Sequence, residues 1–215
     1  MFAWKDTDWS AAATIGHVMP DLSDESTGMM AGTKVATAIG WRPVEAVAAG
    51  DMVLTFDGGM QPVKEVVRRQ YWCTDSDPED WPLRVPAGAL GNRGDMHVLP
   101  RQLILVESDT AEAVLGDPFA LIPAAALDGF RGITRVRPGE VVEAIELRFE
   151  AEEIVYANIG ALFLCPAAGD LLSLGDSAYV PLDLERAHVL VDCLAEEDRG
   201  YVPVAEATPL LRLVA

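Results

Sequence analysis

The residues best able to carry out nucleophilic or metal chemistry are few and widely spaced in this chain. The three cysteines, Cys73, Cys165 and Cys193, form no Cys-x-x-Cys pair. An odd number of cysteines without that spacing fits neither a disulfide framework nor a zinc site. We therefore expect free thiols, buried or partly buried, in a reducing compartment.

One polar segment concentrates carboxylates: Asp75, Asp77, Glu79 and Asp80. Such a set can bind a hard cation, but the segment lacks the glycine and the distal glutamate of a calcium loop. We interpret it as a solvated loop. The sequence thus predicts no metal site, and no motif in it indicates a cofactor.

Composition and missing motifs exclude further classes of function. The 215 residues include 34 acidic and 16 basic side chains, a formal net charge of −18. Neutralising phosphates requires clustered Lys and Arg, whereas the densest basic run is Arg68-Arg69, so nucleic acid is not an expected partner. The chain carries no Gly-x-Ser-x-Gly elbow, HExxH motif or phosphate loop, which argues against a hydrolase of those classes.

Short runs of β-branched and apolar residues, bounded by Gly and Pro, dominate the middle of the chain. This density of short runs, with hardly any long helical period, predicts an all-β domain. Alternation also predicts that 141–149 is a half-buried strand, forming a hairpin with 154–158. Strands are expected at 33–37, 52–56, 61–67, 83–85, 96–98, 103–106, 141–149 and 154–158.

The sequence changes character after Pro166. Asp183 can cap a helix that Gly200 ends, which predicts a small helical appendage on the β body. The stripe expected to face that body contains Leu184, Ala187, His188, Val191, Leu194 and Ala195.

No stretch is apolar for long enough to span a bilayer. The first ten residues carry Asp6 and Asp8 and lack the apolar core of a secretory signal, so we expect a soluble, cytoplasmic protein without membrane contact.

A Gly-Thr pair, a strand, a glycine turn, a Pro-Val-Glu edge and a Gly-Asp pair follow one another along the chain. These and further motifs occupy Gly32-Thr33 to Thr37, Gly40 to Glu45, Ala49 to Thr55, Gln61 to Val63, Pro86 to Gly91, Leu99 to Leu105, and Ile145 to Phe149 with Ile154 to Gly160. Their order resembles that of the Hint (hedgehog/intein) domain in the version found in many bacterial proteins. The resemblance implies a leader (1–27), a compact Hint-like β domain (28–166) and a C-terminal appendage (167–215).

The resemblance also implies a chemistry. An autoprocessing Hint domain begins with Cys or Ser, whose side chain attacks the preceding carbonyl in an N-to-S or N-to-O acyl shift. A histidine from a Thr-x-x-His-type strand end helps to protonate the departing amide nitrogen. Transfer to a nucleophile then releases the upstream segment.

This chain departs from the family pattern at both positions. The nucleophile position, four residues before Gly32, is Gly28, and the histidine position is Gln102. Glycine has no attacking group, and an amide is no proton shuttle near neutral pH. The histidines His17, His97 and His188 all lie outside the motif, and we interpret them as structural or surface residues.

The resemblance therefore predicts a degenerate site and a non-catalytic binding or assembly module for a protein partner that the sequence does not identify. In this hypothesis Gly28 and Gln102 face each other across a shallow polar pocket and form a structural joint. The alternative is a self-cleaving domain in which Ser26 or Thr27 performs an N-to-O shift; a hydroxyl before glycine is also what an ordinary turn uses.

Overall fold

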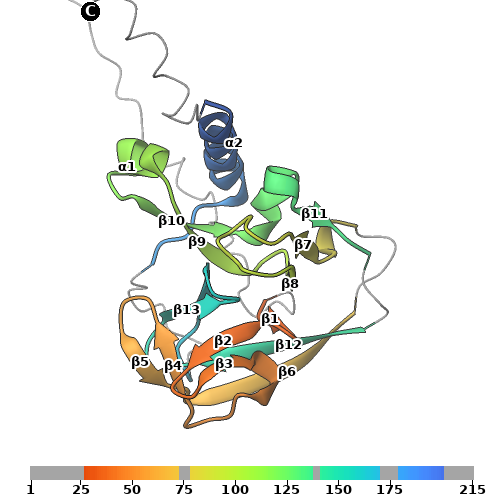
Figure 1. Ribbon diagram of the computed structural model, residues 1–215, viewed down its shortest axis with the longest axis vertical. Coiled ribbons are helices and arrows are strands. Elements are labelled where there is room, and N and C mark those ends of the chain that lie inside the picture. The colour runs from red at the N-terminus through yellow and green to blue at the C-terminus, as the bar shows by residue number, and fades with distance from the viewer. Residues whose placement is uncertain (1–26, 73–77, 138–140, 170–178, 201–215) are drawn as a thin grey trace, which may run out of the picture.

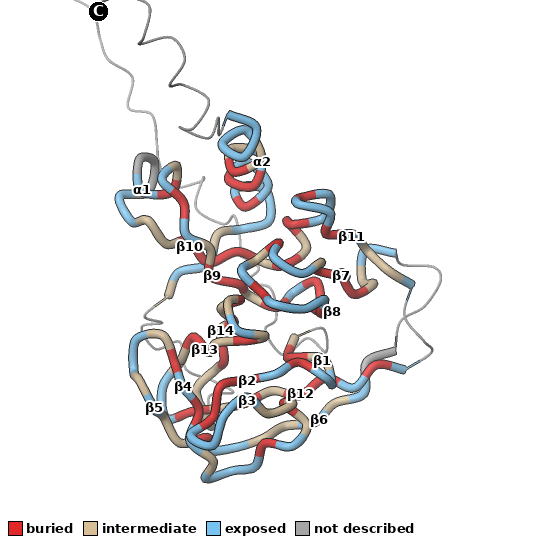
Figure 2. Tube along the Cα trace, in the orientation of Figure 1, coloured by how far each residue is buried: buried red, intermediate tan, exposed pale blue. Residues whose placement is uncertain are grey.

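The computed structural model describes residues 27–72, 78–137, 141–169 and 179–200. Antiparallel strands dominate this part of the chain (Figure 1), which confirms the all-β prediction. Two sheets share one apolar core, which includes Val35 and Val53 of one sheet and Leu83 and Ile145 of the other. Figure 2 shows the buried segments running through the centre of the molecule.

The first sheet has six strands in the order β11-β7-β8-β1-β12-β6. The very short strand β1 lies inside this sheet, because its Met29 pairs with Val98 of β8 on one side and with Ile145 of β12 on the other. The strands are β1 (Met29–Met30), β6 (Glu65–Trp72), β7 (Leu83–Val85), β8 (Met96–Val98), β11 (Thr134–Arg135) and β12 (Val141–Arg148).

The second sheet has eight strands in the order β10-β9-β14-β13-β2-β4-β5, with β3 paired to β2. The strands are β2 (Lys34–Thr37), β3 (Gly40–Pro43), β4 (Met52–Thr55), β5 (Gly59–Pro62), β9 (Leu103–Glu107), β10 (Phe119–Pro123), β13 (Glu153–Ala157) and β14 (Ala161–Cys165). Short 3-10 turns connect several strands: η2 (Val44–Ala46), η3 (Pro78–Asp80), η4 (Ala124–Leu127) and η5 (Phe130–Gly132).

Two strand predictions are wrong, and both errors arise where the chain changes sheet. The run 61–67 is divided between β5 and β6, because the N–H of Val63 donates to Asp51 in one sheet while that of Lys64 donates to Arg148 in the other. The expected hairpin of 141–149 with 154–158 does not form: β12 pairs with β1 and β6, whereas β13 pairs with β14, β2 and β4.

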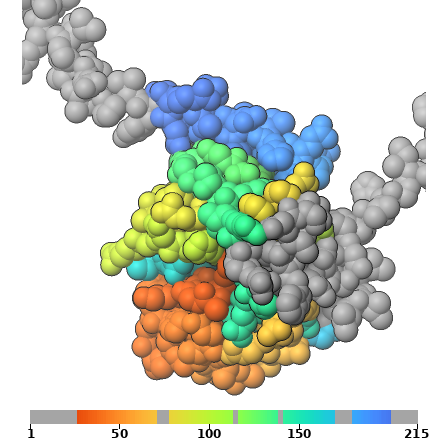
Figure 3. Space-filling model, turned by 90° about the vertical axis from the view of Figure 1, so that its right-hand side faces the viewer, coloured from red at the N-terminus to blue at the C-terminus, as the bar shows by residue number. Residues whose placement is uncertain are grey.

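The C-terminal helix α2 (Leu184–Gly200) forms as predicted, and its cap is Asp183, whose Oδ1 accepts from the N–H of Arg186 at 2.8 Å. The predicted set of α2 residues that face the β body is partly wrong. Leu184 and His188 are exposed, while Leu190 is buried with Ala187, Val191 and Leu194. In Figure 3 this helix lies against the body. None of the helices within the described ranges is long and apolar enough to span a membrane.

A second helix, α1 (Asp109–Leu115), was not predicted. Ser108 caps it by accepting from the N–H groups of Thr110 and Ala111, and Gly116 ends it in the left-handed region. Thr110 also contacts α2, since its N–H donates to Glu197 Oε1 at 3.2 Å. The two helices therefore support each other on one side of the β body (Figure 1).

Candidate functional site

The structure places Gly28 and Gln102 in direct contact. The backbone N–H of Gly28 donates to Gln102 Oε1 at 3.1 Å, and both residues are buried. Gln102 thus hydrogen-bonds the backbone at Gly28, as the hypothesis of a structural joint predicts. This hydrogen bond therefore joins the segment before β1 to the segment before β9, 74 positions later in the sequence.

Gly28 is fixed in place by β1, which follows it inside the first sheet. Its φ is +105°, a region that L side chains rarely adopt. A β-carbon built on Gly28 would lie 3.2 Å from the carbonyl oxygen of Ile145 on β12. Both the backbone conformation and the neighbouring strand thus favour glycine here.

The side chain of Gln102 is held by backbone carbonyls at the start of β9 and near the end of β14. Its Nε2 donates to the carbonyls of Leu103 and Leu164, each at 3.0 Å. A flip of the amide would aim Oε1 at two carbonyl oxygens and leave the N–H of Gly28 facing a donor. The network therefore keeps the oxygen of Gln102 toward Gly28.

This arrangement sets limits on the chemistry of the pair. The atom that faces the Gly28 nitrogen is a hydrogen-bond acceptor, whereas cleavage of the preceding peptide bond requires a proton to be delivered to that nitrogen. Both N–H groups of the Gln102 amide are already used on carbonyl oxygens. The pair can hold two strand ends together, but it supplies neither an attacking group nor a proton.

The alternative nucleophiles are placed less favourably. Thr27 is half-buried, and Ser26 lies outside the described residues. Attack by the Thr27 hydroxyl on the preceding carbonyl would expel the nitrogen of Thr27. Gln102 contacts the nitrogen of Gly28 instead.

The remaining reactive side chains do not gather at this site. His97 and His188 are exposed on β8 and α2, and His17 lies outside the described residues, as does Cys73. Cys165 is buried at the end of β14, and burial raises the pKa of its thiol well above the usual range, so it is a neutral core side chain. Cys193 is half-buried on α2.

The acidic segment gives no cation site in the described part of the chain. Asp75 and Asp77 lie outside it, while Glu79 and Asp80 belong to the turn η3. Across the described ranges, no group of three or more His, Cys, Asp or Glu residues is arranged to hold a metal ion.

Removing the Gln102 amide is expected to destabilise the fold. In Gln102→Leu the buried N–H of Gly28 loses its partner, which should lower the free energy of unfolding by about 2 kcal/mol. Urea denaturation followed by circular dichroism measures this loss. The matched control Gln70→Leu alters an exposed glutamine on β6 and should change stability by less than about 0.5 kcal/mol; equal effects of the two variants would contradict the joint.

Comparison with protein families gives a match that covers most of the chain. Residues 27–162 match the sequence model of the family described as "Hint domain". A search of curated proteins finds no match.

Several solved structures are similar at low sequence identity. The bacterial intein-like domain from Clostridium thermocellum is 15% identical, with 64% of this chain and 97% of that chain covered at a TM-score of 0.47. The gp41-1 intein is 14% identical, with 65% and 97% covered at a TM-score of 0.39. For the MchDnaB-1 intein the identity is 13%, the coverage 63% and 98%, and the TM-score 0.38.

Proposed function

Because the chain belongs to the Hint domain family, we propose that it is a Hint domain that no longer cleaves itself and serves as a non-catalytic module for binding or assembly. The observation that carries this proposal is the hydrogen bond from the Gly28 N–H to Gln102 Oε1. These two residues stand where the resemblance expects the nucleophile and the histidine. In this proposal the old reactive centre has become a structural joint.

The loss of chemistry follows from both members of the pair. An acyl shift begins when a side-chain sulfur or oxygen attacks the preceding carbonyl, and Gly28 has no such atom. The shift also requires a proton for the leaving nitrogen, and Gln102 presents an acceptor there. Either change alone would slow the reaction, and together they leave no route through these two residues.

The test is the intact mass of the purified chain after overnight incubation with and without dithiothreitol or hydroxylamine. We expect a single species of full-length mass in every condition. Cleavage next to Ser26, Thr27 or Gly28 would contradict the proposal. If Ser26→Ala or Thr27→Ala abolished that cleavage, the alternative N-to-O shift would replace it.

The binding role needs its own experiment. We propose a protein partner, since the net charge of −18 disfavours a polyanion such as nucleic acid. Capture from native lysate with the full chain identifies candidates, and a genuine partner must then bind the purified protein. A cytoplasmic location and the division at residues 27 and 166 stay predictions, which fractionation and limited proteolysis would test.

A further inference from the structure

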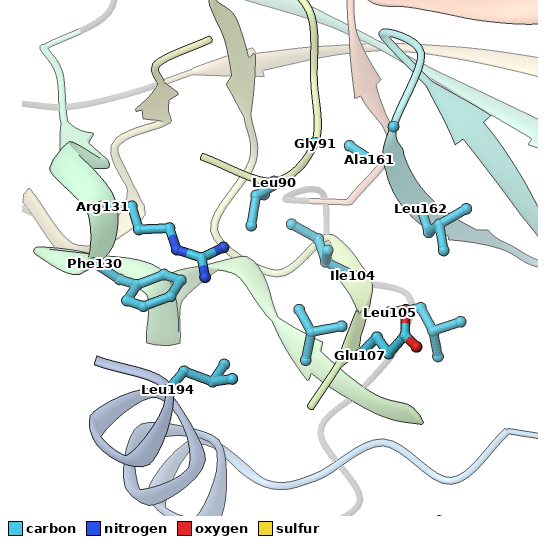
Figure 4. A pocket seen from close by; sticks show the side chains of 12 residues that line it. Leu90, Gly91, Ile104, Leu105, Glu107, Phe130, Arg131, Ala161, Leu162 and Leu194 are labelled. Atoms are coloured by element: carbon cyan, nitrogen blue, oxygen red, sulfur yellow. The ribbon is translucent and has the colours of Figure 1, made fainter. Parts of the chain in front are cut away.

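A pocket lies where the C-terminal helix α2 meets the β body, and neither Gly28 nor Gln102 lines it. Its volume is about 310 Å³, close to the lower end of the range for small-molecule sites. Figure 4 shows side chains from β9, η5, β14 and α2 around it. Because α2 supplies one wall through Leu194, the pocket exists only while this helix is docked.

The walls are mainly apolar. Their apolar side chains are those of Leu90, Ile104, Leu105, Val106, Phe130, Leu162 and Leu194, with Ala161 beside them. Gly91 and Gly160 also line the pocket, at a point where their backbones touch. A ligand that fills this space must therefore present an apolar surface to most of the lining.

Two charged side chains complete the lining, and Figure 4 shows them on opposite sides of the pocket. Arg131 is already satisfied: its Nε and Nη2 donate to the two carboxylate oxygens of Asp198 at 2.6 and 2.7 Å, and its Nη1 donates to Ala89 at 3.2 Å. The hydrogen bond to Arg131 lowers the pKa of Asp198, which keeps this ion pair charged near neutral pH.

Glu107, at the end of β9, has no such partner. Within the described ranges its carboxylate makes no hydrogen bond or ion pair, and the residue is exposed at the edge of the pocket. Glu197 adds another negative charge, close enough to Arg131 to raise the pKa of its guanidinium together with Asp198. Arg131 interacts with Asp198 and Glu197, and Glu107 lies on the opposite side of the pocket, so the summed charge of these four groups is negative and favours a cation.

We propose that this pocket binds a small apolar amine, with the apolar group against Ile104, Phe130 and Leu194 and the ammonium group at Glu107. The charged end remains at the exposed edge, so the ammonium keeps part of its hydration. The apolar end gains contact with walls on three sides. This binding site is additional to the proposed protein-binding role and does not depend on it.

The test compares two probes of similar shape, 2-phenylethylamine and 2-phenylethanol, by titration of the full chain followed by isothermal calorimetry and methyl NMR. The amine is expected to bind about three- to fivefold more tightly than the alcohol, because only the amine pairs with the exposed carboxylate of Glu107. Shifts should concentrate on the methyl groups of Leu90, Ile104 and Leu194.

Three variants decide the assignment. Glu107→Gln should weaken the binding of the amine about three- to fivefold and leave that of the alcohol unchanged. Glu185→Gln, which removes an exposed charge on α2 outside the pocket, should change neither. Leu194→Trp should block both probes by filling the space; circular dichroism shows whether it folds, and Glu107→Gln decides the question if it does not. Equal binding of the two probes, or no saturable shift of these methyl groups, would overturn the proposal.

Discussion

Replacing Gly160 with alanine is expected to prevent folding, or to lower the free energy of unfolding by more than about 3 kcal/mol. A β-carbon on Gly160 would lie 2.2 Å from the carbonyl oxygen of Gly91 and 2.5 Å from its carbonyl carbon. Real non-bonded atoms do not approach so closely. Because both partners are backbone, no side-chain rotation can relieve the overlap.

Neither loop at this contact can easily withdraw. The loop around Gly91 is closed by buried Asn92, whose Oδ1 accepts from Leu90 and whose Nδ2 donates to Pro86 and Gly94. On the other side, Asn158 exchanges hydrogen bonds with Lys34. A shift of the Gly91 loop would break the hydrogen bonds of buried Asn92, and a shift of the other loop would break those between Asn158 and Lys34.

Gly94→Ala is the matched control, because Gly94 lies in the same loop, has no positive φ and has open space around a β-carbon. Its stability should stay within about 0.5 kcal/mol of the parent protein. Urea denaturation of both variants measures the difference. If Gly160→Ala unfolded at the same urea concentration as the parent, the close approach of the two backbones would be wrong.

The second large effect is expected from placing at positions 28 and 102 the nucleophile and the histidine that the resemblance implies. The double variant Gly28→Cys with Gln102→His should cleave partially, in a thiol-dependent way, between residues 27 and 28. The nitrogen of residue 28 already faces the side chain at position 102 at 3.1 Å, so a protonated imidazole placed there can supply the leaving nitrogen with its proton. The parent chain and Gln102→His alone should remain full length.

Backbone strain limits how far this rescue goes. A side chain at φ +105° and 3.2 Å from Ile145 should cost about 1–3 kcal/mol of stability, so part of the double variant is expected to misfold. Gly32→Cys is the control, since Gly32 has a φ of +91° and no atom within 4 Å of a β-carbon. It carries a thiol under similar backbone strain away from Gln102, and should not cleave. A folded double variant that stays intact in dithiothreitol would show that the pair is not positioned for an acyl shift.

Local sequence patterns were sufficient to predict strands that pair with a strand nearby in the sequence. The strands 83–85 and 96–98 are observed with these bounds, and they pair with each other in one hairpin. Patterns failed where one apolar run serves two sheets, as at 61–67, because alternation reports burial and not the identity of the partner strand. The helix α1 had readable signals in Ser108 and Gly116, but seven residues give too short a period to stand out.

The Gly28–Gln102 site was likewise predictable in part. Contact between positions 28 and 102 was expected from the order of family motifs, and the structure brings them together. The carbonyls of Leu103 and Leu164 that orient the amide were not predictable, since a backbone acceptor leaves no mark on residue type. The pocket was equally hidden, because its walls come from segments that meet only after α2 has docked.

The position of β1 has a consequence for how the chain folds during synthesis. This strand is made before the other strands that the structure describes, yet its partners are β8 and the much later β12. At typical elongation rates, the wait from Met30 to Arg148 is on the order of ten seconds. Throughout that time the first sheet lacks β12, the strand that lies between β1 and β6. Pairing β1 with β12 requires contacts between segments far apart in sequence, which are slow to form. The nascent protein therefore completes its fold late, and in the meantime exposes strand edges that a holding chaperone would recognise.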